Sequence, residues 1–325
     1  MKKQDYKKYF YLIAPDLKQT ERIILQELHT EVPQLQEAAA HLITSGGKRL
    51  RPAFLLLAGK LFREEIDFML PMAAAMEIAH VGTLVHDDVV DASDFRRGVE
   101  TVRARYGESV SLCAGDFLFA RSLQLASEFG DRRVLERLTE GCCTICAGEI
   151  EQLQEAFSPA QTVRSYLRRI RKKTALLISL SCEVGAMQCG ANETEIRALR
   201  NFGNNLGMAF QISDDVLDFT ADEKVLGKPV GSDVRNGLMT FPLLYAMQDP
   251  ETEKLVRKQF AAGRLEEEAA EKIIEKVKAA GGIDAAVYLA ERYAARAVQN
   301  LEIFPPSAAK ESLCCIARQV ARRNF

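Results

Sequence analysis

Long segments rich in Ala, Leu and Met dominate this sequence, and their apolar residues recur at helical spacing. Examples are residues 70–91, 108–129 and 204–219, which are too long for strands and contain many strong helix formers. Alternating β-branched runs joined by hairpin turns are almost absent. The pattern therefore predicts an all-α protein, a bundle of roughly ten or more helices of ordinary length.

Breaks between these segments coincide with the few prolines and glycines, among them Pro33, Pro71, Pro159 and Pro250. The chain has 325 residues, a length that suits either two domains or one large helical body. No low-complexity segment and no close repeat divides it. We therefore expect residues 1–325 to form a single all-helical domain.

Composition and charge exclude several classes of protein. Lys and Arg number 43 against 45 Asp and Glu, and 47% of residues are hydrophobic, so neither disorder nor nucleic-acid binding is indicated. The first residues are basic, but Pro15 breaks their short apolar run and no small-residue cleavage pattern follows, unlike in a signal peptide. No other stretch is long and apolar enough to cross a bilayer, so a cytoplasmic location is expected.

Three of the eight cysteines, Cys142, Cys143 and Cys146, lie together and include one C-x-x-C spacing. A zinc site needs about four ligands, and neither a second C-x-x-C pair nor a histidine lies nearby. Free Cys in an apolar helix behaves as a small hydrophobe. These residues are therefore predicted to be buried thiols.

The pattern D-D-x-x-D occurs twice, as Asp87, Asp88 and Asp91 and as Asp214, Asp215 and Asp218. On a helix, the first and last carboxylates of this pattern lie on one face about a turn apart, with the middle one beside them. Leu84 stands three residues before the first copy and Gln211 three before the second, and apolar residues continue each face. Both clusters are therefore expected to point toward the interior.

Six carboxylates near an interior repel one another, which is unfavourable unless cations bind between them. Magnesium fits these donors, because it binds a few carboxylates and keeps waters and substrate phosphates in its shell. The alternative is two unrelated acidic surface patches, and the repetition of the motif in the same apolar context counts against it. We expect all six aspartates to bind Mg²⁺.

Basic residues lie close in sequence to each aspartate motif. Arg96 and Arg97 follow the first, Lys228 follows the second, and residues 46–52 place three cations before a helix. Both Arg and Lys suit diphosphate oxygens. Separate acidic and basic groups indicate two anionic substrates, at least one of them bound through metal.

The basic run at residues 168–173 has two readings. It is a solvated helix face or a nucleic-acid patch, and the first is usual, so only Lys173 with Thr174 is predicted to be functional. His80 lies seven residues before Asp87, on the same helix face. This position favours a phosphate contact and a hydrogen-bonded core histidine about equally.

These motifs, in this order, resemble those of the trans-type polyprenyl diphosphate synthases along nearly the whole chain. The matching segments are GGKRLRP at 46, EIAH at 77, LVHDDVVD at 84, RRG at 96, AGDFLFARS at 114, GEIEQLQ at 148, KKTALL at 172, FQISDDVLDF at 210 and GKPVGSDVRNG at 227. The ending, with RYAARA at 292 and ARRNF at 321, is most similar to the catalytic large subunit of bacterial hexaprenyl or heptaprenyl diphosphate synthases.

The resemblance implies roles for individual residues at two substrate sites. Isopentenyl diphosphate would be held by Gly47, Lys48, Arg51, His80 and Arg97. The allylic diphosphate would be held by Arg96, Lys173, Thr174, Gln211 and Lys228, with Lys173 and the six aspartates serving catalysis. The family commonly carries Lys at the position of Leu238, which puts one phosphate contact in doubt.

The resemblance further implies an isoprenoid-synthase fold, a large helical bundle around a central active-site cavity. The reaction would condense isopentenyl diphosphate with an allylic diphosphate such as farnesyl diphosphate, with Mg²⁺ as cofactor. Its product would be a long all-trans polyprenyl diphosphate of about 30 to 35 carbons, made for quinone side chains.

Other functions would account for part of these motifs. They are a shorter-chain geranylgeranyl diphosphate synthase, a non-catalytic subunit of the same fold, a class I terpene cyclase and a structural metal-binding protein. A non-catalytic subunit would lose aspartates, a cyclase would lack the GGKRLRP segment, and a structural protein would not need ordered basic motifs.

The expected partner is a second copy or a small helical subunit. Membrane contact is expected only in passing, for product release.

The helix that carries Asp87 places three small residues before it. Thr83, Gly82 and Ala79 stand four, five and eight positions earlier, one to two turns down the same helix. By resemblance, short-chain relatives close the tunnel with bulky aromatic side chains near the first two positions. We therefore predict that the growing tail passes these residues, the alternative being that Gly82 and Ala79 only permit close helix packing.

Overall fold

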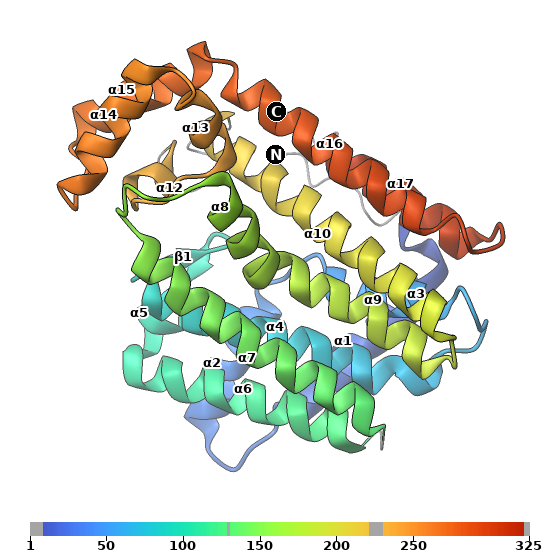
Figure 1. Cartoon of the computed structure of the whole chain (residues 1–325). Coiled ribbons are helices and arrows are strands. Elements are labelled where there is room, and N and C mark those ends of the chain that lie inside the picture. The colour runs from blue at the N-terminus through green and yellow to red at the C-terminus, as the bar shows by residue number, and fades with distance from the viewer. Residues whose placement is uncertain (1–8, 129–130, 221–229, 322–325) are drawn as a thin grey trace.

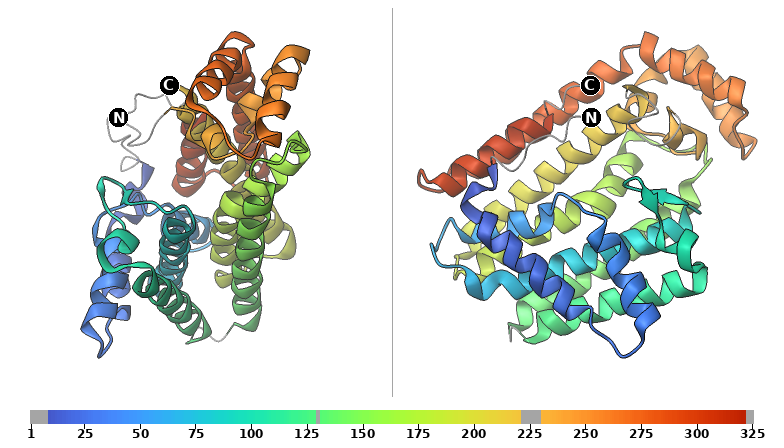
Figure 2. Two further views of the ribbon diagram at one scale, coloured as in Figure 1. Left: turned by 90° about the vertical axis from the view of Figure 1, so that its left-hand side faces the viewer. Right: turned by 180° about the vertical axis from the view of Figure 1, so that it is seen from behind.

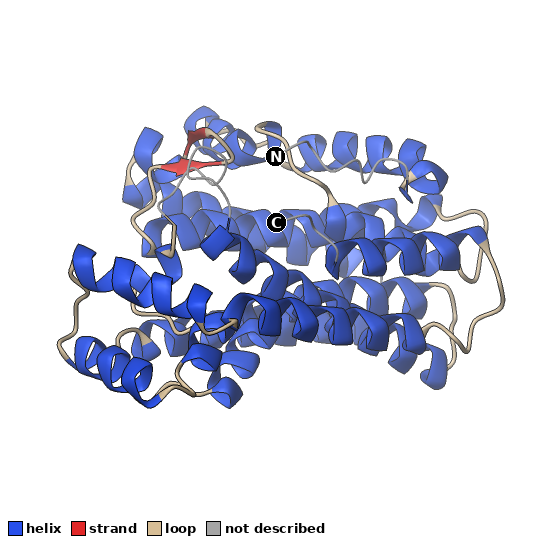
Figure 3. Ribbon diagram, turned by 90° about the horizontal axis from the view of Figure 1, so that it is seen from above, coloured by secondary structure: helices blue, strands red, loops and turns tan. Residues whose placement is uncertain are grey.

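The structure is a computed structural model, which describes residues 9–128, 131–220 and 230–321. Helices make up most of the described chain, as Figure 3 shows. Its strands are β1 (Phe95–Arg96) and β2 (Val99–Glu100), a two-residue antiparallel hairpin. The all-α prediction is confirmed.

The helices follow one another through short connections. The first are η2 (Tyr11–Ile13), α1 (Ala14–Glu27), α2 (Pro33–Thr44), α3 (Leu50–Gly59), η3 (Asp67–Met69), α4 (Leu70–Val90), α5 (Val102–Tyr106) and α6 (Glu108–Glu128). The middle ones are α7 (Arg132–Glu155), α8 (Val163–Ile170), η4 (Arg171–Ala175), α9 (Leu176–Gln188) and α10 (Glu193–Thr220). The last are α12 (Ser232–Arg235), α13 (Phe241–Ala246), α14 (Pro250–Ala261), α15 (Glu267–Ala279), α16 (Gly282–Asn300) and α17 (Ala308–Ala321).

Local sequence signals explain where several helices begin. Pro33 and Pro250 stand in the first turns of α2 and α14, where a missing N–H leaves no hydrogen bond unmade. The side chain of Asp131 caps α7 by accepting a backbone hydrogen bond. Thr162 and Ser165 form a reciprocal capping box at the start of α8.

The long helix α10 connects the two halves of the bundle. It packs against α9 on one side and against α16 on the other, and α9 in turn packs against α3 (Figures 1 and 2). Helix α4 packs against α6 and α1. Two buried apolar clusters result, and α10 contributes to both, with Leu206 in one and Ile212 in the other. The same holds for α16, through Ala297 and Ala290.

The expectation that no stretch is long and apolar enough to cross a bilayer was wrong for the segment that contains α4. Within the described ranges, the segment Asp67–Val90 alone passes the length and composition test for a membrane span, and 78% of its apolar window is buried inside the protein. Met72, Met76 and Ile78 are fully inaccessible to solvent. Such burial is what a core helix of a bundle shows.

Helix α8 continues into α9 through the π-helical turn η4, whose backbone hydrogen bonds span one residue more than those of an α-helix. Single π-helical turns often occur at functional sites. This one carries both Lys173 and Thr174, the residues singled out from the basic run.

The prediction for the cysteines of α7 was wrong. Cys143 and Cys146 are exposed and Cys142 is half-buried. The buried face of α7 is instead formed by Val134, Leu138, Gly141, Ile145 and Gly148. These positions recur at helical spacing, and the three cysteines lie on neighbouring faces.

Candidate active site

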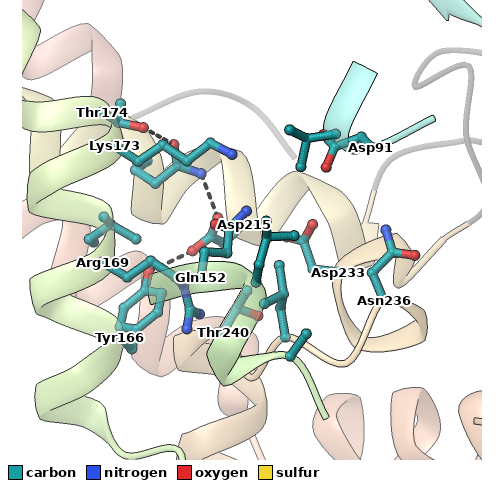
Figure 4. A pocket seen from close by; sticks show the side chains of 16 residues that line it. Asp91, Gln152, Tyr166, Arg169, Lys173, Thr174, Asp215, Asp233, Asn236 and Thr240 are labelled. Carbon is teal, nitrogen blue, oxygen red and sulfur yellow. Dashed lines mark hydrogen bonds between the residues drawn. The ribbon is translucent and has the colours of Figure 1, made fainter. Parts of the chain in front are cut away.

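A cavity of about 370 Å³ lies where α4, α7, α8, η4 and α10 meet. Its lining includes Asp91 from the first aspartate motif and Asp215 from the second. Lys173 and Thr174 enter it from η4, and Figure 4 shows Asp91 across the cavity from them. Residues about 120 positions apart in the chain thus meet at one end of the bundle, because α4 and α10 both end there.

At the first motif, Lys173 lies between two carboxylates. Its Nζ is 2.8 Å from Oε2 of Glu149 and 3.8 Å from Oδ2 of Asp87. Burial raises the pKa of Asp87 to about 6, with Glu149 and Asp91 adding to the effect and Lys173 opposing it. Burial would lower the pKa of Lys173, but the two carboxylates outweigh it and raise that pKa. Lys173 therefore stays charged beside the motif.

The middle aspartate of the first motif is held by an arginine. Asp88 is fully buried, and Nε of Arg96 donates a 2.6 Å hydrogen bond to its Oδ1. Arg96 lies on the β1–β2 hairpin that follows α4. Asp88 thus anchors the hairpin, whereas Asp91 ends α4 exposed at the cavity.

The middle aspartate of the second motif is held more firmly still. The Tyr166 hydroxyl donates a 2.6 Å hydrogen bond to Oδ2 of Asp215, and Nε2 of Gln211 donates one of 2.8 Å to Oδ1. Thr174 in turn donates to Oε1 of Gln211 at 2.6 Å (Figure 4). Burial raises the pKa of Asp215 to about 8, and the nearby charge of Asp233 adds to the rise. This chain of hydrogen bonds joins α8, η4 and α10.

The last aspartate of the second motif fixes the chain beyond α10. The backbone N–H of Asp233 donates to Oδ2 of Asp218 at 3.1 Å, and that of Gly231 donates to the Asp218 carbonyl at 2.8 Å. Asp218 is buried, whereas Asp214 is only half-buried. Asp214 is therefore the aspartate of this motif with the most access to a ligand.

A basic cluster of Arg49, Arg51 and Arg97 lies beside the aspartates, formed by the segment before α3, the start of α3 and the β1–β2 turn. A Cβ added to Gly47 would lie 2.9 Å from Nη1 of both Arg49 and Arg97, so these two guanidinium groups flank its backbone. Burial holds the pKa of His80 well below its ordinary value, and the nearby charges of Arg51 and Arg97 lower it further. His80 is therefore neutral at pH 7. Of the residues assigned to isopentenyl diphosphate, Gly47 thus lies against Arg97, and the charges of Arg51 and Arg97 act on His80.

A protein-family model described as Polyprenyl synthetase matches residues 32–277 of this chain. The chain belongs to the polyprenyl synthetase family. Heptaprenyl diphosphate synthase component 2 of Bacillus subtilis is 37% identical over 320 residues, which cover 98% of this chain and 91% of that protein. Octaprenyl diphosphate synthase of Escherichia coli is 34% identical over 315 residues, which cover 96% and 97% of the two chains.

Solved structures agree with this assignment. A heptaprenyl diphosphate synthase from Staphylococcus aureus has a TM-score of 0.91 at 36% identity, covering 96% of this chain and 99% of its own. A polyprenyl synthase from Caulobacter crescentus, complexed with calcium and isoprenyl diphosphate, has a TM-score of 0.93 at 34% identity and covers 100% of both chains. The chain is therefore a prenyltransferase of the polyprenyl synthetase family with the predicted helical fold.

The aspartates of this polyprenyl synthetase fit a metal ion whose ligands come partly from the protein and partly from the substrate. No three His, Cys, Asp or Glu side chains among the residues that the structure describes converge to form a closed metal cage. The raised pKa of Asp87 nevertheless shows carboxylates crowded in a poorly hydrated site. Mg²⁺ commonly binds through one or two carboxylates and completes its shell with waters and phosphate oxygens. The donor set fits that mode of binding.

The positions assigned to chain length lie deeper on α4. Ala79 and Gly82 are buried, and the Thr83 hydroxyl donates to the His80 carbonyl at 2.7 Å. A Cβ on Gly82 would lie 3.4 Å from Leu118 Cβ, so Gly82 faces α6. Passage of a growing tail along these residues stays a prediction.

Side-chain hydrogen bonds that sequence reasoning did not predict hold the segment that carries Leu238. Nε2 of Gln161 donates to the Gly237 carbonyl at 2.9 Å, and the Met239 N–H donates to Oε1 of Gln161 at 2.9 Å. Nη2 of Arg169 donates to the Met239 carbonyl, also at 2.9 Å. Leu238 itself lines the cavity.

Two of the assigned residues, Lys48 and Lys228, follow glycines in the chain. Lys228 lies outside the described residues, and Lys48 lies within them next to Gly47. Glu149 and Tyr166 were not assigned, although both contact assigned side chains. Glu149 stands within the GEIEQLQ segment, which offered a signal, whereas Tyr166 had none beyond standing seven residues before Lys173.

Proposed function

We propose that this polyprenyl synthetase joins isopentenyl diphosphate to an allylic diphosphate such as farnesyl diphosphate. The observation that carries the proposal is the juxtaposition of a basic cluster and an acidic cavity. Burial lowers the pKa of Arg51 to about 10, and Glu77 and Asp214 are the carboxylates that oppose this. Arg51 therefore lies near the second aspartate motif. One diphosphate bound at the basic cluster and another bound at the aspartates would bring their reacting carbons into the same cavity.

The proposed roles follow from what each side chain contacts. Asp87, Asp91 and Asp214 would hold Mg²⁺, which when bound supplies positive charge to the diphosphate oxygens. Lys173, kept charged by its carboxylate neighbours, would donate to the same diphosphate. Thr174 keeps Gln211 oriented through its 2.6 Å hydrogen bond.

The proposed reaction begins when the allylic C–O bond breaks and its electron pair leaves with the diphosphate. Preorganised cationic groups stabilise the charge that develops there. The isopentenyl double bond attacks the resulting allylic cation, forming one carbon–carbon bond. A proton then passes to the released diphosphate, which leaves a chain longer by one isoprene unit. No protein nucleophile is required.

The proposed product is a long all-trans chain of about 30 to 35 carbons, since the residues one to two turns below Asp87 are small. Relatives named heptaprenyl and octaprenyl diphosphate synthases support a long product. A relative named short chain isoprenyl diphosphate synthase, 40% identical over 240 residues, keeps a geranylgeranyl product as the second candidate. Quinone side chains would be the use of the long product, and the cytoplasm its site of synthesis.

The proposed assembly is either a homodimer or a heterodimer with a small helical subunit. Two relatives are named component 2 of heptaprenyl diphosphate synthase, which supports the heterodimer. Within the chain, we propose one domain for residues 1–325, because α10 and α16 each contribute to both apolar clusters.

The test is a product analysis. Purified protein is incubated with isopentenyl and farnesyl diphosphates and Mg²⁺, with and without EDTA and with and without a candidate small subunit, and products are measured by mass spectrometry. Metal-dependent polyprenyl diphosphates are expected. Cyclised hydrocarbon without incorporated isopentenyl units would indicate a terpene cyclase, and no product in any arm would contradict the proposal.

A further inference from the structure

A buried carboxylate lies inside the basic cluster. Glu77, three residues before His80 on α4, is only 2% exposed. Its Oε1 accepts a hydrogen bond from Nη1 of Arg49 at 3.2 Å, and its Oε2 is buried without a hydrogen-bond partner among the residues that the structure describes. Burying a carboxylate oxygen without a partner is unfavourable. The negative charge of Glu77 therefore explains its buried position better than its hydrogen bonding does.

Two further arginines depend on the charge of Glu77. Burial lowers the pKa of Arg51 to about 10, and Glu77 is the largest of the charges that oppose this. Burial also lowers the pKa of Arg97, and Glu77 again opposes it most. The positive charges of Arg49 and Arg97 repel each other across Gly47. Glu77 is thus the buried negative charge shared by three crowded cations.

We propose that Glu77 is a charge-balancing residue, which offsets the repulsion among the arginines of the basic cluster while the site is empty. The inference rests on the proposed function, in which this cluster binds isopentenyl diphosphate. A bound diphosphate supplies negative charge of its own, and at that moment Glu77 repels it. Glu77 therefore stabilises the empty protein and weakens diphosphate binding, which keeps the site formed between turnovers without holding the ligand too tightly.

The geometry allows the charge to be removed without dispersing the cluster. Arg49 has two other partners, because its Nε donates to Oε1 of Glu21 at 2.9 Å and its Nη2 donates to the Ile43 carbonyl at 2.8 Å. Arg97 also donates through Nη1 to the Gly46 carbonyl. These contacts keep both guanidinium groups in place when Glu77 is replaced by its neutral isostere.

The test compares Glu77→Gln with the parent in EDTA, using inorganic pyrophosphate as the probe. Without metal, the aspartate motifs repel the anion, so binding reports on the basic cluster. The thermal midpoint of the empty variant should fall by about 5 °C or more, as expected when a buried ion pair is broken. Its dissociation constant for pyrophosphate should become about three- to tenfold tighter, because a nearby negative charge has gone.

Glu183→Gln is the matched control. Glu183 is also buried, at 3% exposed, and accepts hydrogen bonds from Nε and Nη2 of Arg137 at 3.1 and 3.0 Å. It lies ten residues beyond Lys173 and faces α7 and α10. Its replacement should lower the thermal midpoint and leave pyrophosphate binding unchanged. Arg51→Ala should abolish that binding and so locate the probe.

A compensating variant covers the case in which Glu77→Gln does not fold. Arg49→Gln with Glu77→Gln removes one charge of each sign, so the thermal midpoint and the pyrophosphate affinity should both return toward those of the parent. The inference is overturned if the double variant shows no recovery. It is also overturned if the pyrophosphate affinity of Glu77→Gln is unchanged or weaker than that of the parent. A parent that does not bind pyrophosphate in EDTA, or binds it without Arg51, overturns the proposed isopentenyl site instead.

Discussion

The Tyr166 hydroxyl lies 2.6 Å from Oδ2 of Asp215, and both side chains are buried. Because Gln211 donates to the other oxygen, the carboxylate of Asp215 is fully engaged by protein. In the first motif, one carboxylate oxygen of Asp88, Oδ1, is bound to Arg96. The middle aspartates thus anchor neighbouring elements, which leaves Asp87, Asp91 and Asp214 as the better candidates for metal ligands.

Replacing Tyr166 with Phe should lower both stability and turnover. The variant leaves one buried carboxylate oxygen without its donor, a loss of about 1–3 kcal/mol in the free energy of unfolding. Turnover should fall because Gln211 alone then orients Asp215. Denaturant unfolding and steady-state kinetics measure the two effects. Tyr245→Phe, at a half-buried position on α13, serves as the control, and equal effects in both variants would refute the role of the hydroxyl.

Asp87→Ala and Asp214→Ala should each reduce turnover by about a thousandfold or more, because each removes a proposed magnesium ligand. Circular dichroism should show an intact helical fold. Asp116→Ala changes an exposed aspartate on α6 and should retain parental activity. Near-normal turnover in either motif variant would remove that residue from the site.

Acid should destabilise the empty protein partly through His80. Burial and then the nearby arginines lower its folded pKa well below the unfolded value of 6.5, so the unfolded state binds more protons below that pH. Stability is therefore lost as the pH falls below about 6.5, and the loss stops once the folded histidine also takes up a proton. His80→Gln should reduce the drop in thermal midpoint between about pH 7.5 and 5.5. His29→Gln, at an exposed position, should leave it unchanged; an identical drop in both would contradict this account.

Gly82→Phe should shorten the product. An aromatic ring beside Leu118 and Phe119 would obstruct a tail descending between α4 and α6, and each isoprene unit spans roughly one helical turn of about 5.4 Å. Mass spectrometry should show several units fewer per chain. Gly82→Ala is the control, because its Cβ makes ordinary contacts at 3.4 Å. A folded, active Gly82→Phe enzyme with unchanged products would place the tail elsewhere.

The purified chain alone should be weakly active and should gain activity with a small helical subunit. The motif set is complete, so any activity gained would arise from completing or ordering this chain, not from replacing missing aspartates. Light scattering gives the assembly state and turnover gives the activity. Full long-chain synthesis by an isolated homodimer would decide for the homodimer.

The fold and the outline of the site could be predicted from sequence because both depend on local periodicity. Helical spacing identified α4 and α10, and the D-D-x-x-D motifs marked their ends near one cavity. Partners distant in sequence could not be found in this way. Tyr166 and Asp215 are 49 residues apart, and Gln161 contacts Met239 across 78. Such pairs are set by how helices dock, which no single segment encodes.

The cysteines of α7 show the opposite failure. The average hydrophobicity of a segment was used where the position of each residue around the helix was needed. The segment around Cys143 is apolar overall, but only one stripe of it meets the core. Helix phase, which average hydrophobicity does not report, determines which residues are buried.

The π-helical turn η4 makes the number of residues between Tyr166 and Thr174 as important as their identity. A π-helical turn holds one residue more than an α-helical turn, so removing one residue from η4 would restore ordinary winding with little change in the orientation of α8 relative to α9. Within the shortened turn Lys173 and Thr174 would shift instead, so Thr174 would lose its hydrogen bond to Gln211 while Tyr166 kept its place beside Asp215. Between these two positions the enzyme should tolerate substitution far better than deletion.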